Sequence, residues 1–332
     1  MGKFTNVLYA GALAMLAFSS CSEKNEGYLI DGQVTDVKEG MMYLKKYVDK
    51  TFVEVDSAII VDGKFRFEGV TSEALAHGLT TRKESNRPMV FFLDNDAMKV
   101  TMNESGKELE VIGSEANEIF MRNAKITRSK GYSLDSLISA HPASAVAAYF
   151  VVKDFAYKLD LEGMKAVRAK FDASLNGSSY IRQIESMIAR MEKVQVGSEA
   201  PDFTLPDVDG NPVSLSSFRG KYVLVDFWAG WCPDCRKENP NIVAAWEKYK
   251  DKNFAILGVS LDRTRDQWLA AIEKDKLAWT QVSDLKYWNS EAAVLYCIRW
   301  IPMSFLIDPE GKIVAIGLEG EELHNKLEEL LK

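Results

Sequence analysis

Short runs of alternating or β-branched residues follow one another from residue 28 to about residue 112. The clearest runs cover residues 52–55, 58–61, 64–67 and 89–93. Asp62-Gly63 separates two of them, and this dipeptide is typical of a tight β-hairpin. We therefore predict a small antiparallel β domain over residues 28–113, built as a sandwich or a curled sheet.

Between residues 114 and 195 the hydrophobic period changes to that of a helix. Ile181, Ile184, Ile188 and Met191 recur every three or four positions, which places them on one helix face. Two more helices are predicted over residues 143–157 and 161–175, with Asn176 and Gly177 ending the second. We interpret residues 114–195 as a helical connector; a dedicated binding module is the alternative.

Strand-like and helix-like patterns alternate from residue 196 to residue 332. The predicted strands cover residues 222–227, 254–260, 303–307 and 313–317, and the predicted helices cover residues 233–249, 265–274 and 321–331. Such alternation indicates an α/β sheet with helices on both faces. The predicted fold class is thus an α/β domain at the C-terminus, preceded by the β domain and the helical connector.

The first residues have the layout of a secretory signal. Lys3 precedes an apolar run over residues 7–18, and Ser19-Ser20 comes directly before Cys21. Twelve apolar residues are too few to cross a bilayer core of about 30 Å as a helix. A cysteine in this place resembles the acylated cysteine of bacterial lipoproteins, so we predict a signal peptide over residues 1–20, lipidation of Cys21 and a tether over residues 21–27. A simple secreted signal is the alternative.

Charge and cysteine content narrow the function classes. The chain of 332 residues carries 41 Lys and Arg against 48 Asp and Glu, a net charge of −7. This balance argues against nucleic acid as a partner, because phosphate binding needs clustered positive charge. Four scattered cysteines are too few for a disulfide scaffold. No glycine-rich phosphate loop lies between a predicted strand and helix, so nucleotide binding has no support.

Cys232 and Cys235 form a Cys-x-x-Cys motif where the strand over residues 222–227 gives way to a helix. Unpaired N–H groups and the positive end of the helix dipole favour a thiolate at Cys232. Cys235 follows about one turn later and is close enough to form a disulfide with it. The arrangement suits thiol-disulfide exchange, in which the first cysteine attacks and the second resolves the mixed disulfide.

Half a zinc site and a purely structural disulfide are the alternatives for this motif. A zinc site needs about four ligands. The sequence has no second cysteine pair, and His77, His141 and His324 lack ligand spacing. We therefore expect no metal and no cofactor.

Residues 225–240 and 301–308 carry a family resemblance. The first segment, VDFWAGWCPDCRKENP, resembles the active-site segment of thioredoxin-like proteins, specifically the exported, membrane-attached thiol-disulfide oxidoreductases typified by cytochrome c maturation factors. The second segment, IPMSFLID, resembles their cis-proline loop. The resemblance covers residues 196–332 and implies a thioredoxin fold with Pro302 cis and facing the cysteines. The front part resembles, loosely, an uncharacterised β domain that precedes such modules in bacterial lipoproteins.

The same match implies roles for two acids. Asp226 corresponds to the buried acid that relays a proton to or from the resolving cysteine. Its alternative is a structural carboxylate satisfied by hydrogen bonds. Glu238 corresponds to an acid three residues after the second cysteine, and its alternative is an exposed helix residue.

Five residues are assigned to the substrate-binding rim of the site: Trp231, Pro233, Asp234, Ile301 and Pro302. The Pro233-Asp234 pair departs from the Gly-Pro of thioredoxin. A carboxylate beside the thiols disfavours a thiolate, so we predict a reducing potential. Trp228 is as consistent with core packing as with the site. Cys297 is interpreted as a small buried core residue, with an auxiliary thiol near the site as the alternative.

The leading hypothesis is a lipid-anchored enzyme that reduces protein disulfides in the cell envelope, facing the periplasm. Its partners would be protein thiols and disulfides, a membrane thiol reductase as electron donor, and the membrane through the lipid. Ser22 after Cys21 favours the outer membrane by analogy. One alternative is a lipoprotein that binds a ligand or partner and carries an auxiliary thioredoxin module. A peroxidase is a weaker alternative, because Val225 and Ala229 occupy the positions where a peroxidatic motif needs Pro and Thr or Ser.

Overall fold

The computed structural model describes residues 26–48 and 51–332, so the predicted signal peptide and Cys21 lie outside the described residues. Within the described ranges, no helix has the length and apolar character needed to cross a membrane. Backbone contacts divide the chain into two compact units, one ending at Phe120 and the other running from Met121 to Lys332. The division falls inside helix α1 (Glu115–Ala124).

The first unit is built on one β-sheet, which confirms the predicted β-rich domain. Its strands are β1 (Tyr28–Val34), β2 (Glu39–Val48), β3 (Thr51–Val61), β4 (Lys64–Gly69), β5 (Leu75–Thr80), β6 (Met89–Leu93), β7 (Ala97–Met102) and β8 (Leu109–Ile112). The hydrogen-bonded order is β6-β5-β2-β3-β4-β1-β7-β8. All described neighbours pair antiparallel except β1 and β7, which run in parallel.

The predicted hairpin joins β3 to β4. Asp62 and Gly63 take left-handed φ values of 51° and 77°, and Val61 pairs with Lys64 across the turn. The two runs expected at residues 52–55 and 58–61 are parts of the single strand β3. The polar residues between them do not break this strand, because most of it is exposed and a strand tolerates polar side chains on its solvent face.

Alternating burial builds the core of this sheet. Phe65 and Phe67 of β4 are buried, whereas their neighbours Lys64, Arg66 and Glu68 are exposed. The same alternation holds along β7. Each large apolar side chain buried in this way stabilises the fold by roughly 1.5–3 kcal/mol. No cysteine lies in this sheet, so apolar burial is what holds it together.

The helical connector is confirmed, with helix ends that differ from those predicted. It contains α2 (Leu134–Ala140), α3 (Ala145–Phe150), α4 (Leu161–Ala169) and α5 (Ser179–Lys193). The helix expected over residues 143–157 loosens into a π turn at Val151–Phe155 and a 3₁₀ turn at Ala156–Lys158. The helix expected over residues 161–175 ends at Ala169 and is followed by a separate 3₁₀ turn. Of the four apolar residues predicted on one face of α5, Ile181, Ile184 and Met191 are buried, and Ile188 is half-buried.

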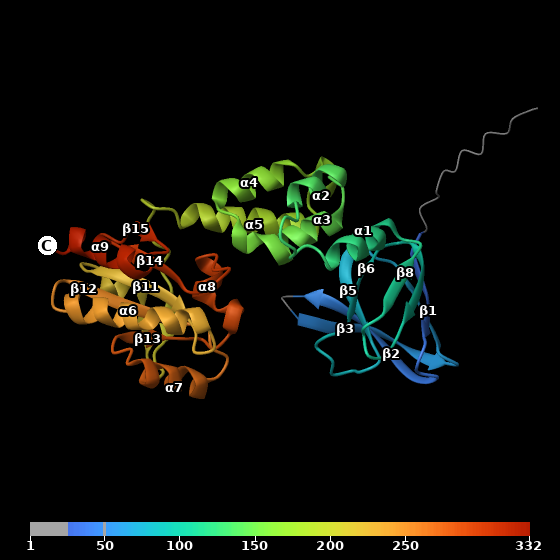
Figure 1. The fold of residues 1–332 in the computed structure, drawn as a ribbon, viewed down its shortest axis with the longest axis horizontal. Coiled ribbons are helices and arrows are strands. Elements are labelled where there is room, and N and C mark those ends of the chain that lie inside the picture. The colour runs from blue at the N-terminus through green and yellow to red at the C-terminus, as the bar shows by residue number, and fades with distance from the viewer. Residues whose placement is uncertain (1–25, 49–50) are drawn as a thin grey trace, which may run out of the picture. The chain divides into compact units, whose positions relative to one another are not determined.

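The C-terminal part has the thioredoxin fold (Figure 1). After the short pair β9 (Thr204–Pro206) and β10 (Pro212–Ser214), the central strands are β11 (Tyr222–Trp228), β12 (Phe254–Ser260), β13 (Thr280–Val282), β14 (Met303–Ile307) and β15 (Ile313–Ile316). Their order is β13-β12-β11-β14-β15. The first three are mutually parallel, while β14 pairs antiparallel with both β11 and β15. The helices are α6 (Pro233–Tyr249), α7 (Arg265–Asp275), α8 (Glu291–Leu295) and α9 (Gly320–Leu330).

Candidate active site

The cysteine pair lies where the central strand β11 passes into helix α6. Six of the seven residues of β11 are buried, so this strand is fixed in the core. Cys232 is the N-cap of α6 with extended backbone angles, and Pro233 occupies the first turn. A proline fits there because the first N–H groups of a helix have no partner within it. The local sequence therefore places Cys232 at the positive end of a 17-residue helix.

The structure holds the pair as a disulfide between Cys232 and Cys235, and both residues are buried. The backbone N–H of Cys235 lies 3.1 Å from Sγ of Cys232 and points at it. The carbonyl oxygen of Ile301 lies 3.7 Å from the same sulfur. The Ile301-Pro302 bond is cis, which confirms the predicted isomer, and the Ile301 contact brings this loop against the cysteines. In the reduced state, the Cys235 N–H would stabilise a Cys232 thiolate.

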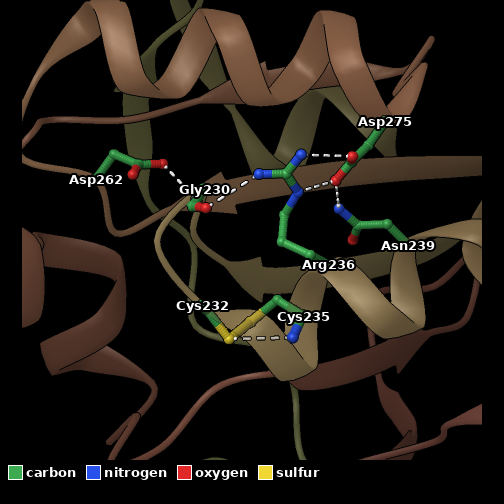
Figure 2. A network of polar contacts seen from close by, with 7 residues as sticks. All are labelled: Gly230, Cys232, Cys235, Arg236, Asn239, Asp262 and Asp275. Carbon is green, nitrogen blue, oxygen red and sulfur yellow. Dashed lines mark hydrogen bonds and ion pairs between the residues drawn. A yellow bond between two sulfur atoms is a disulfide. The ribbon is translucent and has the colours of Figure 1, made fainter.

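Polar contacts fix the loop that leads into the motif on both sides of Gly230 (Figure 2). The Gly230 N–H donates to Asp262 Oδ2 at 2.9 Å, and its carbonyl accepts from Arg236 Nη1 at 3.1 Å. Arg236 also forms a two-pronged ion pair with Asp275, which accepts a further hydrogen bond from Asn239 at 2.6 Å. Side chains of α6, of α7 and of the segment after β12 therefore fix the loop that leads into the motif.

Trp231 and its aromatic neighbours form an exposed rim beside the disulfide. The Trp231 side chain is 39% exposed, and its Nε1 donates to the Leu261 carbonyl at 3.2 Å. The rings of Tyr287 and Trp288 lie 5.2 and 6.1 Å from it, centroid to centroid. The guanidinium of Arg263 lies 3.9 Å from the Tyr287 ring centre, within the range of a cation–π contact. Sequence reasoning identified only Trp231 of this group.

Asp226 lies inside the sheet, paired in register with Gly258 of β12 and Ser304 of β14. Only 2% of it is exposed. Burial, together with the smaller effect of the negative charges of Glu238 and Glu319, raises the pKa of this carboxyl to about 7. A carboxyl with this pKa can both give and take a proton near neutral pH.

Glu238 is held by donors from two helices. Its Oε1 accepts from the Gly320 N–H at 2.8 Å and from Asn241 Nδ2 at 2.7 Å. Glu319, the N-cap of α9, was not identified from the sequence. Burial raises the pKa of Glu319, and Glu238 and then Asp234 raise it further. Asp226, Glu238 and Glu319, which the sequence separates by up to 93 positions, thus interact electrostatically in the folded chain.

The remaining predicted residues have distinct environments. Pro233 and Asp234 are exposed on the first turn of α6. Trp228 is buried, and its Nε1 donates to Gln281 Oε1 at 3.0 Å, so it belongs to the core. Cys297 is a free thiol with φ of 54°, and it is half-buried rather than buried as predicted. Its sulfur lies 3.8 Å from the Met187 carbonyl of α5, because the connector covers this part of the domain.

Among the described residues, no cluster of three or more His, Cys, Asp or Glu side chains is placed to hold a metal ion. The three histidines have separate surroundings. His77 Nδ1 lies 2.9 Å from the Leu75 carbonyl, His141 is the C-cap of α2, and His324 Nε2 lies 2.8 Å from Asn241 Oδ1.

Two family models match the chain. The AhpC/TSA family model matches residues 196–316, and a domain of unknown function, DUF4369, matches residues 28–120. Among solved structures, the thioredoxin domain of a thiol-disulfide oxidoreductase from Bacteroides vulgatus is 47% identical and covers 42% of this chain and 99% of its own, with a TM-score of 0.40. A second structure, of a "putative Thiol:disulfide interchange protein DsbE" from Chlorobium tepidum, is 31% identical and covers 42% of this chain and 99% of its own, with a TM-score of 0.39.

The fold and the site together define a thioredoxin-like protein-disulfide oxidoreductase. The thiol-disulfide oxidoreductase ResA of Bacillus cereus is 32% identical over 158 residues, which are 48% of this chain and 89% of the relative. ResA of Oceanobacillus iheyensis is 37% identical over 129 residues, covering 37% of this chain and 64% of that protein. The chain belongs to this family of thiol-disulfide oxidoreductases.

Proposed function

We propose that Cys232 is the attacking thiolate and Cys235 the resolving thiol. The observation that carries this is the position of Cys232 Sγ at the start of α6, in contact with the Cys235 N–H. The Cys232 thiolate attacks a substrate disulfide, forms a mixed disulfide and releases one substrate thiolate. Cys235 then attacks Cys232 Sγ, releases the second substrate thiolate and closes the Cys232–Cys235 disulfide. Two electrons pass to the substrate, and a dithiol donor restores the reduced pair.

Asp226 would serve this cycle as a proton acceptor and donor for Cys235. The resolving thiol must lose its proton before it attacks, and a carboxyl with a pKa near 7 accepts a proton at little cost at neutral pH. Glu238 would supply a negative charge that helps to keep the pKa of the Asp226 carboxyl near 7. Trp231, Pro233, Asp234, Ile301 and Pro302 would form the surface against which the substrate chain rests.

The direction of electron flow is proposed to be reductive. Asp234 is exposed on the first turn of α6, and its charge acts on Glu319 in the same region. Negative charge near the motif disfavours the Cys232 thiolate, and a less stable thiolate form makes the pair a better reductant. A membrane thiol reductase would supply the electrons, because an exported compartment lacks the cytosolic thiol pool.

We expect the Cys235→Ser variant to remain joined to its substrates through Cys232. Serine cannot resolve the mixed disulfide, so covalent adducts should accumulate on non-reducing gels when the reduced variant is mixed with insulin whose disulfides are intact, and with disulfide-containing envelope proteins. The variant is best made in a Cys297→Ser background, which leaves Cys232 as the reactive thiol of the domain. Adducts that form equally well in a Cys232→Ser/Cys297→Ser control would contradict the assigned order of attack.

The proposed location is the cell envelope, with Cys21 lipidated, the protein facing the periplasm and the outer membrane as its anchor. The support is the pattern of residues 1–22, a basic start, a short apolar run and small residues before the cysteine. Acyl chains on Cys21 would hold the protein stably, since each buried CH₂ contributes about 0.8 kcal/mol. Growth with a labelled fatty acid should mark the natural chain, and equal labelling of Cys21→Ala would refute lipidation at this residue.

A further inference from the structure

A chain of side-chain hydrogen bonds leads from Glu238 to helix α9. Asn241 Nδ2 donates to Glu238 Oε1 at 2.7 Å and to the Gly320 carbonyl at 3.1 Å. His324 Nε2 lies 2.8 Å from Asn241 Oδ1. Glu238 and Asn241 lie one turn apart on α6, whereas His324 lies one turn into α9.

We infer that Asn241 and His324 are positioning residues that fix the Glu238 carboxylate beside Asp226. The inference rests on the charge role proposed above for Glu238. Neither residue touches the cysteines in this arrangement, so each acts through Glu238.

Only one orientation of the Asn241 amide satisfies all its neighbours. The Glu238 carboxylate and the Gly320 carbonyl are both acceptors, so the NH₂ group must face them. The amide oxygen then faces His324, and Nε2 of that ring must carry the hydrogen. If His324 offered no donor, the amide could turn, and its oxygen would then face two other oxygens. The histidine donor therefore keeps the amide directed at Glu238.

The position of Glu238 matters because several acids share this region. Asp226 of β11 is faced by Glu238 from α6 and by Glu319 from the start of α9. The pKa of Glu319 is in turn raised by burial and then by the negative charges of Glu238, Asp234 and Glu322. The Gly320 N–H at the start of α9 and Asn241 both donate to Oε1 of Glu238, which stabilises its negative charge at a fixed point. Loss of one donor would let this charge move away from Asp226.

The test compares His324→Phe, His324→Gln, Glu238→Gln and the Glu238→Gln/His324→Phe double variant in the full chain. The first readout is the alkylation rate of the reduced cysteines between pH 5 and 10, in which the inflection that Asp226→Asn abolishes is the one assigned to Asp226. We expect Glu238→Gln and His324→Phe to move this inflection to lower pH, the latter by roughly 0.3–0.5 of a unit, a two- to threefold change in proton affinity. His324→Gln keeps a donor and should match the natural chain.

The double variant separates positioning from a general packing effect. If His324 acts through Glu238, His324→Phe should add nothing once Glu238→Gln is present. The inference would be overturned if the shifts of the inflection in the two single variants added up in the double variant. It would also be overturned if Glu238→Gln shifted the inflection and His324→Phe did not.

A second readout does not depend on the role of Glu238. The side-chain amide resonances of Asn241, assigned in ¹⁵N-asparagine-labelled protein with an Asn241→Ser variant, should move in His324→Phe and return in His324→Gln. A Glu238→Gln pH profile identical to that of the natural chain would refute the charge role of Glu238. The Asn241 amide resonances would then be the sole test of whether His324 positions Asn241. Resonances unchanged by His324→Phe would overturn it.

Discussion

Asp226→Asn is expected to make the protein more stable than the natural chain at pH 8.5, by up to about 4 kcal/mol. Burial raises the pKa of Asp226 to about 7 in the folded chain, whereas an unfolded aspartate has a pKa of about 3.9. The folded chain therefore retains a proton that the unfolded chain releases between about pH 4 and pH 7. This contribution to stability is complete below pH 4 and is lost as the pH rises through 7.

Asparagine has nearly the same shape and never ionises, so its effect should depend on pH. Urea unfolding of Asp226→Asn and of the natural chain at pH 4.5 and pH 8.5 measures the effect on the free energy of unfolding. The two free energies should be similar at the lower pH and differ at the higher one. Asp251→Asn, at an exposed position, is the matched control. A difference between Asp226→Asn and the natural chain that is the same at both pH values would show that burial does not govern this carboxyl.

The same substitution should slow catalysis while it stabilises the fold. Without the carboxyl, Cys235 lacks the proton acceptor that we propose for it, and general-base assistance is typically worth about 10²–10⁴-fold. The stability gained and the rate lost have one physical origin, the burial of an ionisable group where the chemistry needs it.

Cys232→Ser should abolish the reduction of insulin by the full chain with dithiothreitol as donor, a loss of about a thousandfold or more. A serine hydroxyl is not ionised near neutral pH, so no nucleophile remains at the start of α6. Cys297→Ser is the control and should reduce insulin at the natural rate, because Cys297 faces the connector helix α5.

Equal insulin reduction by Cys232→Ser and the natural chain would instead support the binding lipoprotein with an auxiliary thioredoxin module. In that case the sheet of strands β1 to β8 would carry the function. The assay thus separates the two hypotheses with one substitution and one control.

Where local sequence decides the structure, prediction succeeded. Asp62-Gly63 determines its own turn, and the apolar run over residues 222–227 became the buried strand β11. Prediction failed where distant contacts decide. The sequence predicts one helix over residues 143–157, yet after Phe150 the backbone forms a wider π turn and a tighter 3₁₀ turn. Arg299 donates to the carbonyls of Ala156 and Leu159 there.

The residues of the candidate active site also differ in how far the sequence could predict them. Cys232, Cys235 and Asp226 lie within ten residues of one another, so their spacing on a strand and a helix could be read directly. Glu319 and His324 lie more than eighty residues beyond Cys235, and nothing in a single sequence measures the distance between α6 and α9. The ion pair of Arg236 with Asp275 was missed for that reason, since each looks like an ordinary charged helix residue.

The fixation of Gly230 has a consequence for electron transfer. Its N–H and its carbonyl are both held, by Asp262 and by Arg236, and neither bond involves a sulfur atom. Neither hydrogen bond has to break when the disulfide opens, so we expect the loop and the Trp231 side chain to keep their place in the reduced state. The oxidised and reduced enzyme would then present nearly the same surface to substrate and donor. The structural reorganisation in each two-electron step would be confined to the two thiol groups and the protons they exchange.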